Sequence, residues 1–361
     1  MEDRFKIKRK KEFKIPKKLV SFIKFLLFLL IYILFLFLFS QKGTFLKNGA
    51  NVYPLSYKIG EIENKIFYST SKAIYFLEDE KYINFQYFIT DFYVNEDKIF
   101  VFSDNLIILN KDLKVIKEIN KVNYYPKEIY FFKNNFAVKY IKKDSLSIQF
   151  SLFDKKSFKE LKTIKFENLT SMPFSYIYSN GEKILIFQND GDLLILNFNN
   201  EILLQKNVRP KDEILFNPKG FIDEKNEEII LYWQSYSYTT NSILFISFNG
   251  DIKLKLDIKS DINDLILYDN KKAILLDSGI LFLSDNNEKG TLNIPFLKPV
   301  RILNVDGNLV SIWEFNLFYS DYKLLRINNK NYIFEGKFKD IIFNNGEFFI
   351  LIDSRIYKIK I

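Results

Sequence analysis

The pattern of apolar and polar residues divides this 361-residue chain into two unlike parts. Residues 22–39 read FIKFLLFLLIYILFLFLF, an almost unbroken apolar run. After it the apolar runs are short and alternate with turns rich in Gly, Asn and Asp. A long apolar run is typical of a membrane helix, and short runs between turn residues are typical of β-strands. The pattern therefore predicts one helix followed by a large strand-rich domain.

The apolar run is long enough to cross a bilayer. About 20 predominantly apolar residues span the hydrocarbon core as a helix, and residues 19–39 supply 21 with a single charge, Lys24. Residues 1–24 hold ten Lys and Arg, whereas residues 41–60 hold three. Basic flanks stay on the cytoplasmic side of a membrane. We therefore expect a single-pass helix in the cell membrane, a cytoplasmic N-terminus and an extracytoplasmic domain after Ser40.

A cleaved signal peptide is the alternative, because it has the same charged start and apolar centre. Its apolar centre is usually shorter, and the residues after Phe39 (SQKG) show no small-residue cleavage pattern. We therefore favour a retained anchor. Either interpretation puts the bulk of the chain outside the cytoplasm.

The positive charge is concentrated at the N-terminus. Of the formal net charge of +9, residues 1–24 carry +7 and the remaining 337 residues carry +2. Nucleic-acid binding requires clustered Lys and Arg on one face, so no nucleic-acid partner is expected. The tail residues predicted to face anionic lipid of the inner leaflet are Arg9, Lys10, Lys11, Lys17 and Lys18. A pure orientation signal is the simpler interpretation of the same residues.

Two missing residue types limit the chemistry. With no His and no Cys, the chain has no Ser-His-Asp triad, no thiolate nucleophile, no imidazole or thiolate metal ligand and no disulfide. The domain must be held together by its core, for which 48% hydrophobic and 17% aromatic residues are ample. We expect no catalytic residue, no metal and no cofactor. A non-enzyme is favoured over an enzyme.

One strand unit recurs through the rest of the chain. A short apolar run, a tight turn, a second run, another turn and a third run follow one another. The first runs begin at Lys65, Lys98, Asn135, Lys183, Glu228, Lys272, Asn308 and Glu347. Their spacings are 33, 37, 48, 45, 44, 36 and 39 residues, and a period of about 40 is typical of four-stranded propeller blades. A further apolar run upstream of most first runs supplies the fourth strand.

The pattern therefore predicts an all-β fold, a single β-propeller of four-stranded blades. Eight blades are favoured and seven are possible; two separate β-sandwiches are the other alternative. Pairs such as Asp306-Gly307 and Asn345-Gly346 tolerate the positive φ angles of two-residue hairpins. The last unit, ending at residues 355–361, lacks one strand, and an open sheet edge would expose unpaired backbone groups. We expect a segment within residues 44–56 to supply that strand.

These features predict four regions: a basic cytoplasmic tail at 1–18, a transmembrane helix at 19–40, a tether with a possible ring-closing strand at 41–54, and the propeller at 55–361.

The repeat resembles a known family. Residues 183–206, KILIFQNDGDLLILNFNNEILLQK, are similar to the strand, Asp-Gly turn, strand, turn, strand unit of quinoprotein-type (PQQ-like/WD40-like) β-propellers. Residues 98–119 follow the same pattern. Such repeats usually carry a Gly before the last strand and a Trp after it, and here Asn200 and Gln205 stand near those places. The resemblance therefore implies the fold and no quinone cofactor.

Two inter-strand segments, at 234–241 and 314–321, are longer than a hairpin turn needs, and each follows a Trp. Aromatic side chains dominate many protein interfaces. The candidate binding patch consists of Trp233, Tyr236, Tyr238, Trp313, Phe315, Phe318 and Tyr319. The alternative is that both Trp side chains pack between blades and that the other residues reflect an aromatic-rich composition.

We therefore expect a membrane-anchored, extracytoplasmic propeller that serves as a binding platform for a protein partner at the cell envelope. The alternative is a propeller that binds or processes a small ligand or carbohydrate with carboxylates at its central channel. A ligand site should gather Asp, Glu, Tyr or Arg at the channel mouth, whereas a platform should show an apolar patch on its surface and an unremarkable channel.

Overall fold

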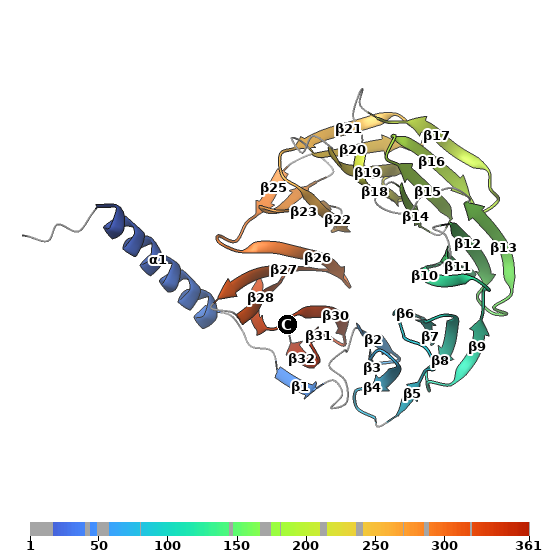
Figure 1. Cartoon of the computed structure of the whole chain (residues 1–361), viewed down its shortest axis with the longest axis horizontal. Coiled ribbons are helices and arrows are strands. Elements are labelled where there is room, and N and C mark those ends of the chain that lie inside the picture. The colour runs from blue at the N-terminus through green and yellow to red at the C-terminus, as the bar shows by residue number, and fades with distance from the viewer. Residues whose placement is uncertain are drawn as a thin grey trace, which may run out of the picture.

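The computed structural model describes residues 17–39, 44–48, 58–79, 81–143, 147–166, 175–180, 182–209, 215–235, 241–269, 271–284, 289–317 and 320–360. Over these residues the chain forms one helix and 32 strands. The strands make eight antiparallel four-stranded sheets arranged as blades around a centre (Figure 1). The predicted eight-bladed propeller is thus confirmed.

The first four blades along the chain follow the order of the strands from the centre outwards. The first contains β2 (Lys58–Ile62), β3 (Lys65–Ser69), β4 (Ala73–Phe76) and β5 (Tyr82–Asn84). The second contains β6 (Asp91–Asn95), β7 (Lys98–Phe102), β8 (Leu106–Asn110) and β9 (Val115–Ile119). The third contains β10 (Tyr124–Phe131), β11 (Asn135–Lys142), β12 (Ile148–Asp154) and β13 (Glu160–Phe166). The fourth contains β14 (Ser175–Ser179), β15 (Lys183–Gln188), β16 (Asp192–Asn197) and β17 (Ile202–Asn207).

The next three blades repeat this order. The fifth contains β18 (Leu215–Asp223), β19 (Glu228–Ser235), β20 (Asn241–Ser247) and β21 (Ile252–Ile258). The sixth contains β22 (Ile262–Tyr268), β23 (Lys271–Leu276), β24 (Gly279–Leu283) and β25 (Lys289–Leu292). The seventh contains β26 (Lys298–Val305), β27 (Asn308–Leu317), β28 (Ser320–Ile327) and β29 (Lys330–Glu335).

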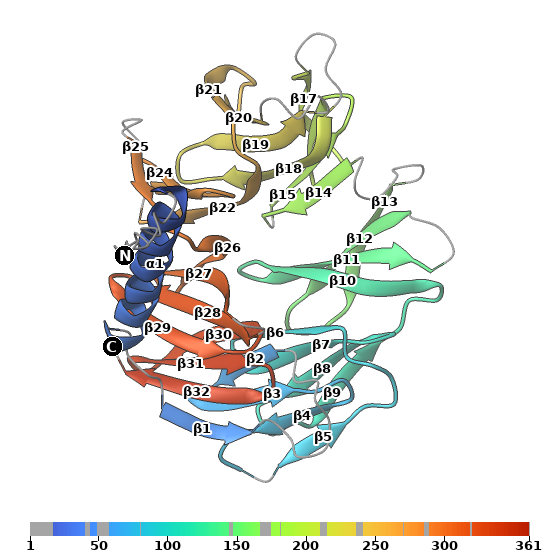
Figure 2. The same ribbon diagram turned by 60° about the vertical axis from the view of Figure 1, so that its left-hand side comes forward.

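The eighth blade joins the two ends of the domain. The chain's last strands, β30 (Phe338–Asn344), β31 (Glu347–Ile352) and β32 (Arg355–Lys360), form its inner three positions. The outer position is taken by β1 (Thr44–Asn48), which pairs antiparallel with β32. The missing strand therefore comes from within the predicted segment, and Figure 2 shows β1 beside β32. This pairing closes the ring because it ties the start of the domain to its end.

The middle strands of each blade form the core because their side chains are apolar on both faces. In β7 all residues after Lys98 are buried, and in β20 every residue except the last is buried. Their side chains pack between neighbouring blades in separate clusters, such as the one that joins Phe187 of β15 to Leu231 and Leu244 of the fifth blade. Outer strands are mostly exposed, as β9 shows. A strand buried on both faces reads as a continuous apolar run, which is why these strands stood out in the sequence.

The turn glycines divide into two groups. In Asp306-Gly307 and Asn345-Gly346 both residues have positive φ, as the predicted two-residue hairpins require. In Asn249-Gly250 only the glycine does, at +89°, and its N–H donates to the Ser247 carbonyl oxygen at 2.9 Å. That turn is therefore longer than predicted and leads into a β-bulge between Phe245 and Ile246.

The apolar run near the N-terminus forms α1 (Lys17–Phe39), which projects outward from the ring of blades (Figure 1). Its contact with the propeller is aromatic: the Phe296 ring packs on Phe25, Phe28 and Tyr32 with centroids 5.7–6.5 Å apart. Within the residues described here, no helix combines the length and the apolar character needed to cross a membrane. The membrane-spanning role of residues 19–40 stays a prediction.

Candidate functional site in the central channel

The two tryptophans of the predicted aromatic patch lie in the core. Trp233 is 2% exposed and Trp313 is fully buried. The Trp313 indole N–H donates to the Ser311 hydroxyl at 2.9 Å, and the Trp233 ring meets Phe187 edge-on at 6.0 Å. These two side chains therefore offer no contact area to a partner.

Most of the other predicted site residues fall outside the described residues. This holds for Tyr236, Tyr238, Phe318 and Tyr319, and for Arg9, Lys10 and Lys11 of the basic tail. The backbone of Phe315 lies in β27 opposite Tyr322, and the backbones of Lys17 and Lys18 begin α1; their side chains are outside the described part. The surface role of these residues stays a prediction.

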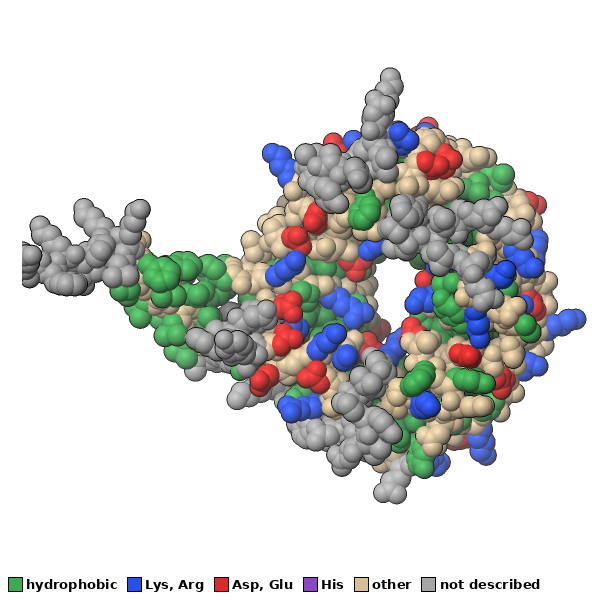
Figure 3. All heavy atoms as spheres, in the orientation of Figure 1, with side chains coloured by type: hydrophobic (Ala, Val, Ile, Leu, Met, Phe, Trp, Pro, Cys, Tyr) green, Lys and Arg blue, Asp and Glu red, His purple; other side chains and the backbone are tan. Residues whose placement is uncertain are grey.

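The centre of the propeller carries a ring of ionisable side chains that sequence reasoning did not identify. Each of these residues lies on the innermost strand of its blade. It stands four positions before the point at which the chain turns into the second strand. The eight members of this channel ring are Lys58, Asp91, Glu128, Tyr176, Lys219, Asp264, Arg301 and Asp340. Because all eight residues are equally far from their turns, they lie at the same height along the axis of the central channel. Figure 3 shows the central opening with basic and acidic side chains at its edge.

Local backbone irregularities help to position the channel ring. In five of the eight blades a β-bulge directly precedes the ring residue, as between Pro299 and Arg301 or between Phe338 and Asp340. A bulge re-aims the side chains that follow it. The residue after each ring member is then a buried apolar anchor, such as Ile302, except in the fifth blade where it is Gly220.

Charges of opposite sign alternate along most of the channel ring. Over six successive blades the members are Lys219, Asp264, Arg301, Asp340, Lys58 and Asp91. Glu128 and Tyr176 complete the circle. Neighbouring blades therefore attract one another at the channel, which offsets part of the cost of holding these groups half-buried.

Part of the channel ring is fully engaged by hydrogen bonds. The Lys58 ammonium donates to Asp91 Oδ1 at 2.8 Å and lies 4.2 Å from the centre of the Tyr93 ring. Glu128 accepts hydrogen bonds from the Lys139 ammonium at 3.1 Å and from the Tyr130 hydroxyl. Burial raises the pKa of Tyr130, and the adjacent Glu128 charge raises it further. These contacts make this side of the channel a structural network.

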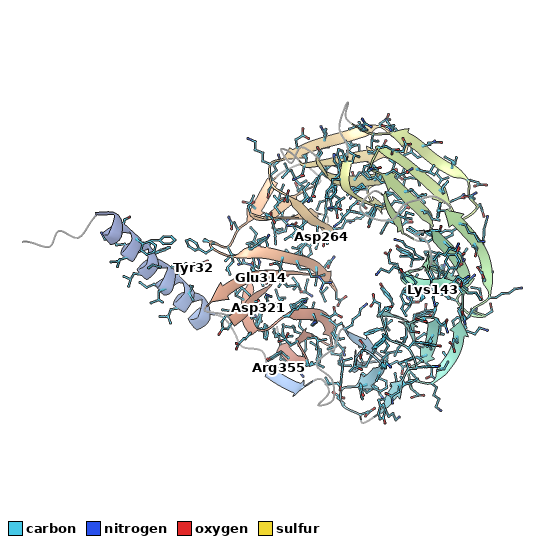
Figure 4. The ribbon with its side chains drawn as sticks, viewed as in Figure 1. Tyr32, Lys143, Asp264, Glu314, Asp321 and Arg355 are labelled. Carbon is cyan, nitrogen blue, oxygen red and sulfur yellow. The ribbon has the colours of Figure 1, made fainter. Side chains whose placement is uncertain are left out.

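The opposite side is less engaged. Asp264, at the inner edge of the ring in Figure 4, accepts a hydrogen bond from the Leu265 N–H at 2.9 Å and forms no ion pair within 4.0 Å with any described residue. Burial raises the pKa of Asp264, and the nearby Lys219 and Arg301 charges oppose that shift. Burial also raises the pKa of Asp340, which lies in the eighth blade next to Lys58, against the N–H groups of Ile59 and Ile341 and the nearby cations. The channel thus holds two carboxyl groups whose ionised forms are disfavoured.

A sequence signal for the channel ring exists. In each unit an ionisable residue stands four positions before the first turn, most often followed by Ile, Leu or Phe, giving the pairs KI, DF, EI, YI, KG, DL, RI and DI. The signal is visible only after the inner strands have been aligned on their turns. Sequence reasoning concentrated on the middle strands, which have the stronger apolar pattern.

A second surface feature lies on the rim of the propeller. At the start of four successive outer strands, β9, β13, β17 and β21, large aliphatic side chains are 44–60% exposed. We call them the outer apolar band: Val115, Ile116, Leu161, Ile202, Leu203 and Ile252. Each strand has a register shift at this position. Ile116, Leu161 and Leu203 are the extra residues of their bulges, and Val115, Ile202 and Ile252 directly precede the extra residue. Figure 1 shows the four strands following one another round the outer edge.

Comparison with known proteins identifies the fold alone. The chain matches no protein-family model and no curated protein sequence. Among solved structures it is similar to BamB from Moraxella catarrhalis, with a TM-score of 0.56 and 12% identity over 89% of this chain and 99% of that one. It is similar to the Dos1 propeller, with a TM-score of 0.56 and 9% identity over 88% of this chain and 94% of that one. The chain is therefore a β-propeller of the kind found in BamB.

Proposed function

We propose that the protein is a membrane-anchored, extracytoplasmic propeller that binds a protein partner at the cell envelope. The observation that carries the binding role is the outer apolar band, since exposed aliphatic side chains recur at the bulge of the outer strand on four neighbouring blades. Contiguous apolar surface on a folded domain is typical of an interaction site.

The outer strands also offer backbone groups. Each is the outermost strand of its sheet, so one row of N–H and C=O groups faces away from the blade. An extended segment of a partner can pair with such an edge, and side-chain contacts then provide specificity. The outer apolar band would supply those contacts.

The anchoring role is supported by the sequence and composition of α1. The sequence of residues 19–39 supplies 21 predominantly apolar residues, and about 20 such residues span a hydrocarbon core of about 30 Å as a helix. Its exposed large apolar side chains, from Phe22 to Leu34, occur all round the helix. A helix that is apolar on every side needs lipid or protein around it. The basic residues before it favour a cytoplasmic N-terminus.

Topology can be tested with cysteine labelling, because the chain has no native cysteine. A Lys253→Cys variant places a single thiol on the exposed strand β21. We expect a membrane-impermeant maleimide to label it in intact cells, and to label a Lys10→Cys variant only after the cells are opened. The reverse pattern, or labelling of neither until lysis, would refute the proposed orientation.

The binding role can be tested by cross-linking in intact cells. The double variant Ile202→Glu/Leu203→Glu places two charges in the outer apolar band, and Val122→Glu is the matched control because Val122 is 79% exposed outside the band. We expect the cross-linked partner to be lost from the double variant and kept by the control. Equal cross-linking of both variants, with equal thermal stability, would rule out the band as the binding surface.

A further inference from the structure

A pocket opens between the first and eighth blades, which are neighbours in the ring (Figure 1). It lies at the end of these blades where the innermost strand turns into the second. Its volume is about 320 Å³, within the range of roughly 300–1,000 Å³ that is typical of small-molecule sites. None of the eight channel ring residues lines it, so this pocket is separate from the channel.

The floor of the pocket is apolar. It is lined by Ile66 of β3, Leu77 directly after β4, and Phe349 of β31. All three side chains belong to the core cluster that joins the first blade to the eighth, and they are only 4–9% exposed. The interface between the two blades therefore supplies a fixed apolar surface at the base of the pocket.

Two hairpin turns place amide side chains at the rim. Asn64 lies in the turn between β2 and β3, and Asn345 lies in the turn between β30 and β31. Both residues have positive φ, as two-residue hairpins require. The Asn345 side chain donates from Nδ2 to Asn64 Oδ1 at 3.3 Å across the blade interface. Among the described residues, the Asn64 amino group and the Asn345 side-chain oxygen then have no hydrogen-bond partner.

Asn344, the last residue of β30, adds a buried amide to the pocket. Side chains alternate along a strand, and Ile342 packs in the cluster that faces the first blade, so the Asn344 side chain points to the same side. Asn344 is 7% exposed, and its side-chain amide has no hydrogen-bond partner in the part of the chain that the structure describes. Buried polar groups are nearly always hydrogen-bonded. A buried, unpartnered amide that lines a pocket therefore indicates a polar ligand.

The charged groups of the pocket do not select a ligand by charge. The Lys358 ammonium and Glu347 Oε2 pair with each other at 2.5 Å, and Glu78 is an exposed residue of the rim. The uncharged amides are the groups that lack partners. An amide offers one acceptor oxygen and two N–H donors, so the matching ligand must both donate and accept hydrogen bonds.

We propose that this pocket binds a neutral pyranose sugar, with its hydroxyl groups bonded to the amides of Asn64, Asn344 and Asn345 and its C–H face on the apolar floor. A hydroxyl both donates and accepts, as an amide does. An ammonium ligand accepts no hydrogen bond and would leave the amide N–H groups unpaired. A carboxylate donates none and would leave the amide oxygens unpaired. The inference goes beyond the protein-partner role, does not depend on it, and uses a site other than the carboxylate-lined channel considered from the sequence.

The test is ligand titration of the purified full chain, in a detergent without a sugar headgroup, by isothermal calorimetry and by thermal shift. The probes are glucose, galactose, mannose and N-acetylglucosamine, each as the free sugar and as the methyl glycoside, with glucosamine and glucuronate as charged analogues. We expect at least one neutral sugar to bind saturably and to raise the melting temperature. Binding of the methyl glycoside would assign the ligand to the end of a glycan, and binding of the free sugar alone would assign it to a monosaccharide. Binding of no neutral sugar at millimolar concentration, or tighter binding of a charged analogue, would overturn the proposal.

Two variants and a matched control make the test specific. Asn344→Leu keeps the side-chain size but removes the amide, and it should weaken sugar binding about 2- to 10-fold, the effect of one hydrogen bond. Its melting temperature without ligand should be unchanged or higher, because the free protein loses no hydrogen bond. Glu78→Ala, on the exposed rim, is the second variant and should weaken binding without changing that temperature. Asn95→Leu is the control, because Asn95 ends β6 and pairs with Lys98 as Asn344 ends β30 and pairs with Glu347.

The outcomes that contradict the site differ from those of a merely structural asparagine. A clear fall in the melting temperature of Asn344→Leu without ligand would show that the amide serves the fold. Unchanged sugar binding by folded Asn344→Leu and Glu78→Ala, or an equal loss in Asn95→Leu, would also count against the assignment.

Discussion

Closure of the ring by β1 gives a quantitative prediction. Removing residues 1–49 deletes this strand, whereas removing residues 1–40 leaves it in place. The strand is held in register by four residue pairs: Thr44 with Lys358, Phe45 with Tyr357, Lys47 with Ile356, and Asn48 with Arg355. Four such pairs make about four backbone hydrogen bonds, each worth a net 0.5–1.5 kcal/mol, or about 2–6 kcal/mol together. For a domain of this size, that loss lowers the melting temperature by roughly 4–12 °C.

The assay compares the two shortened proteins by scanning calorimetry and by light scattering after size exclusion. The form without residues 1–49 should melt earlier. It should also self-associate, because β32 then becomes an open edge strand. A synthetic peptide of residues 41–50 should restore the melting temperature, and a peptide of scrambled order should not.

The result that would refute this reasoning is specific. If the two forms melt within about 1 °C of each other, a loss of even one net hydrogen bond is excluded. If both are also monomeric, β32 does not behave as an open edge. The eighth blade would then be stable with three strands, and β1 would have no structural role.

Three further predictions concern stability. Gly191→Ala should be clearly more destabilising than Gly346→Ala in urea unfolding. Both glycines have positive φ, which costs a non-glycine residue about 1–2 kcal/mol. An added Cβ at Gly191 would also lie 2.7 Å from the Arg209 backbone N, whereas an added Cβ at Gly346 meets nothing within 4 Å. Equal effects would show that the backbone near Arg209 can shift. Lys272→Met should lower the free energy of unfolding by about 3–5 kcal/mol, because the Lys272 ammonium and Glu228 Oε1 form a buried pair at 2.8 Å. The double variant Lys272→Met/Glu228→Gln should recover part of that loss. Strictly additive effects of the two substitutions would argue against the pair. Burial raises the pKa of Asp264 in the folded protein, so its contribution to stability is fully present below the unfolded pKa and is lost as pH rises through the folded pKa. Asp264→Asn should therefore gain stability relative to the native protein over that pH range, and a difference that does not change with pH would contradict the assigned shift.

The sequence by itself determined the period, the strand types and the need for closure. Second strands such as KIFVF at residues 98–102 are apolar on both faces because neighbouring blades cover them, so their positions were readable from a local pattern. The closing strand was also predictable, because the last unit is one strand short and an open edge is costly. The first argument uses residues that are close in sequence, and the second needs only the number of strands in the last unit.

Only the tertiary structure decided which residues meet at the channel. Successive members of the channel ring are 33 to 48 residues apart in the chain, and each looks like an ordinary polar residue in a half-buried strand. Their common level depends on turn length and on bulges such as the one before Arg301, which no local pattern reveals. The sequence could not decide whether Trp233 and Trp313 are buried, for the same reason. A tryptophan at the end of a strand gives the same sequence pattern whether the next blade or water covers it. Burial and proximity between blades depend on how the ring closes, and that is set by packing over the whole chain.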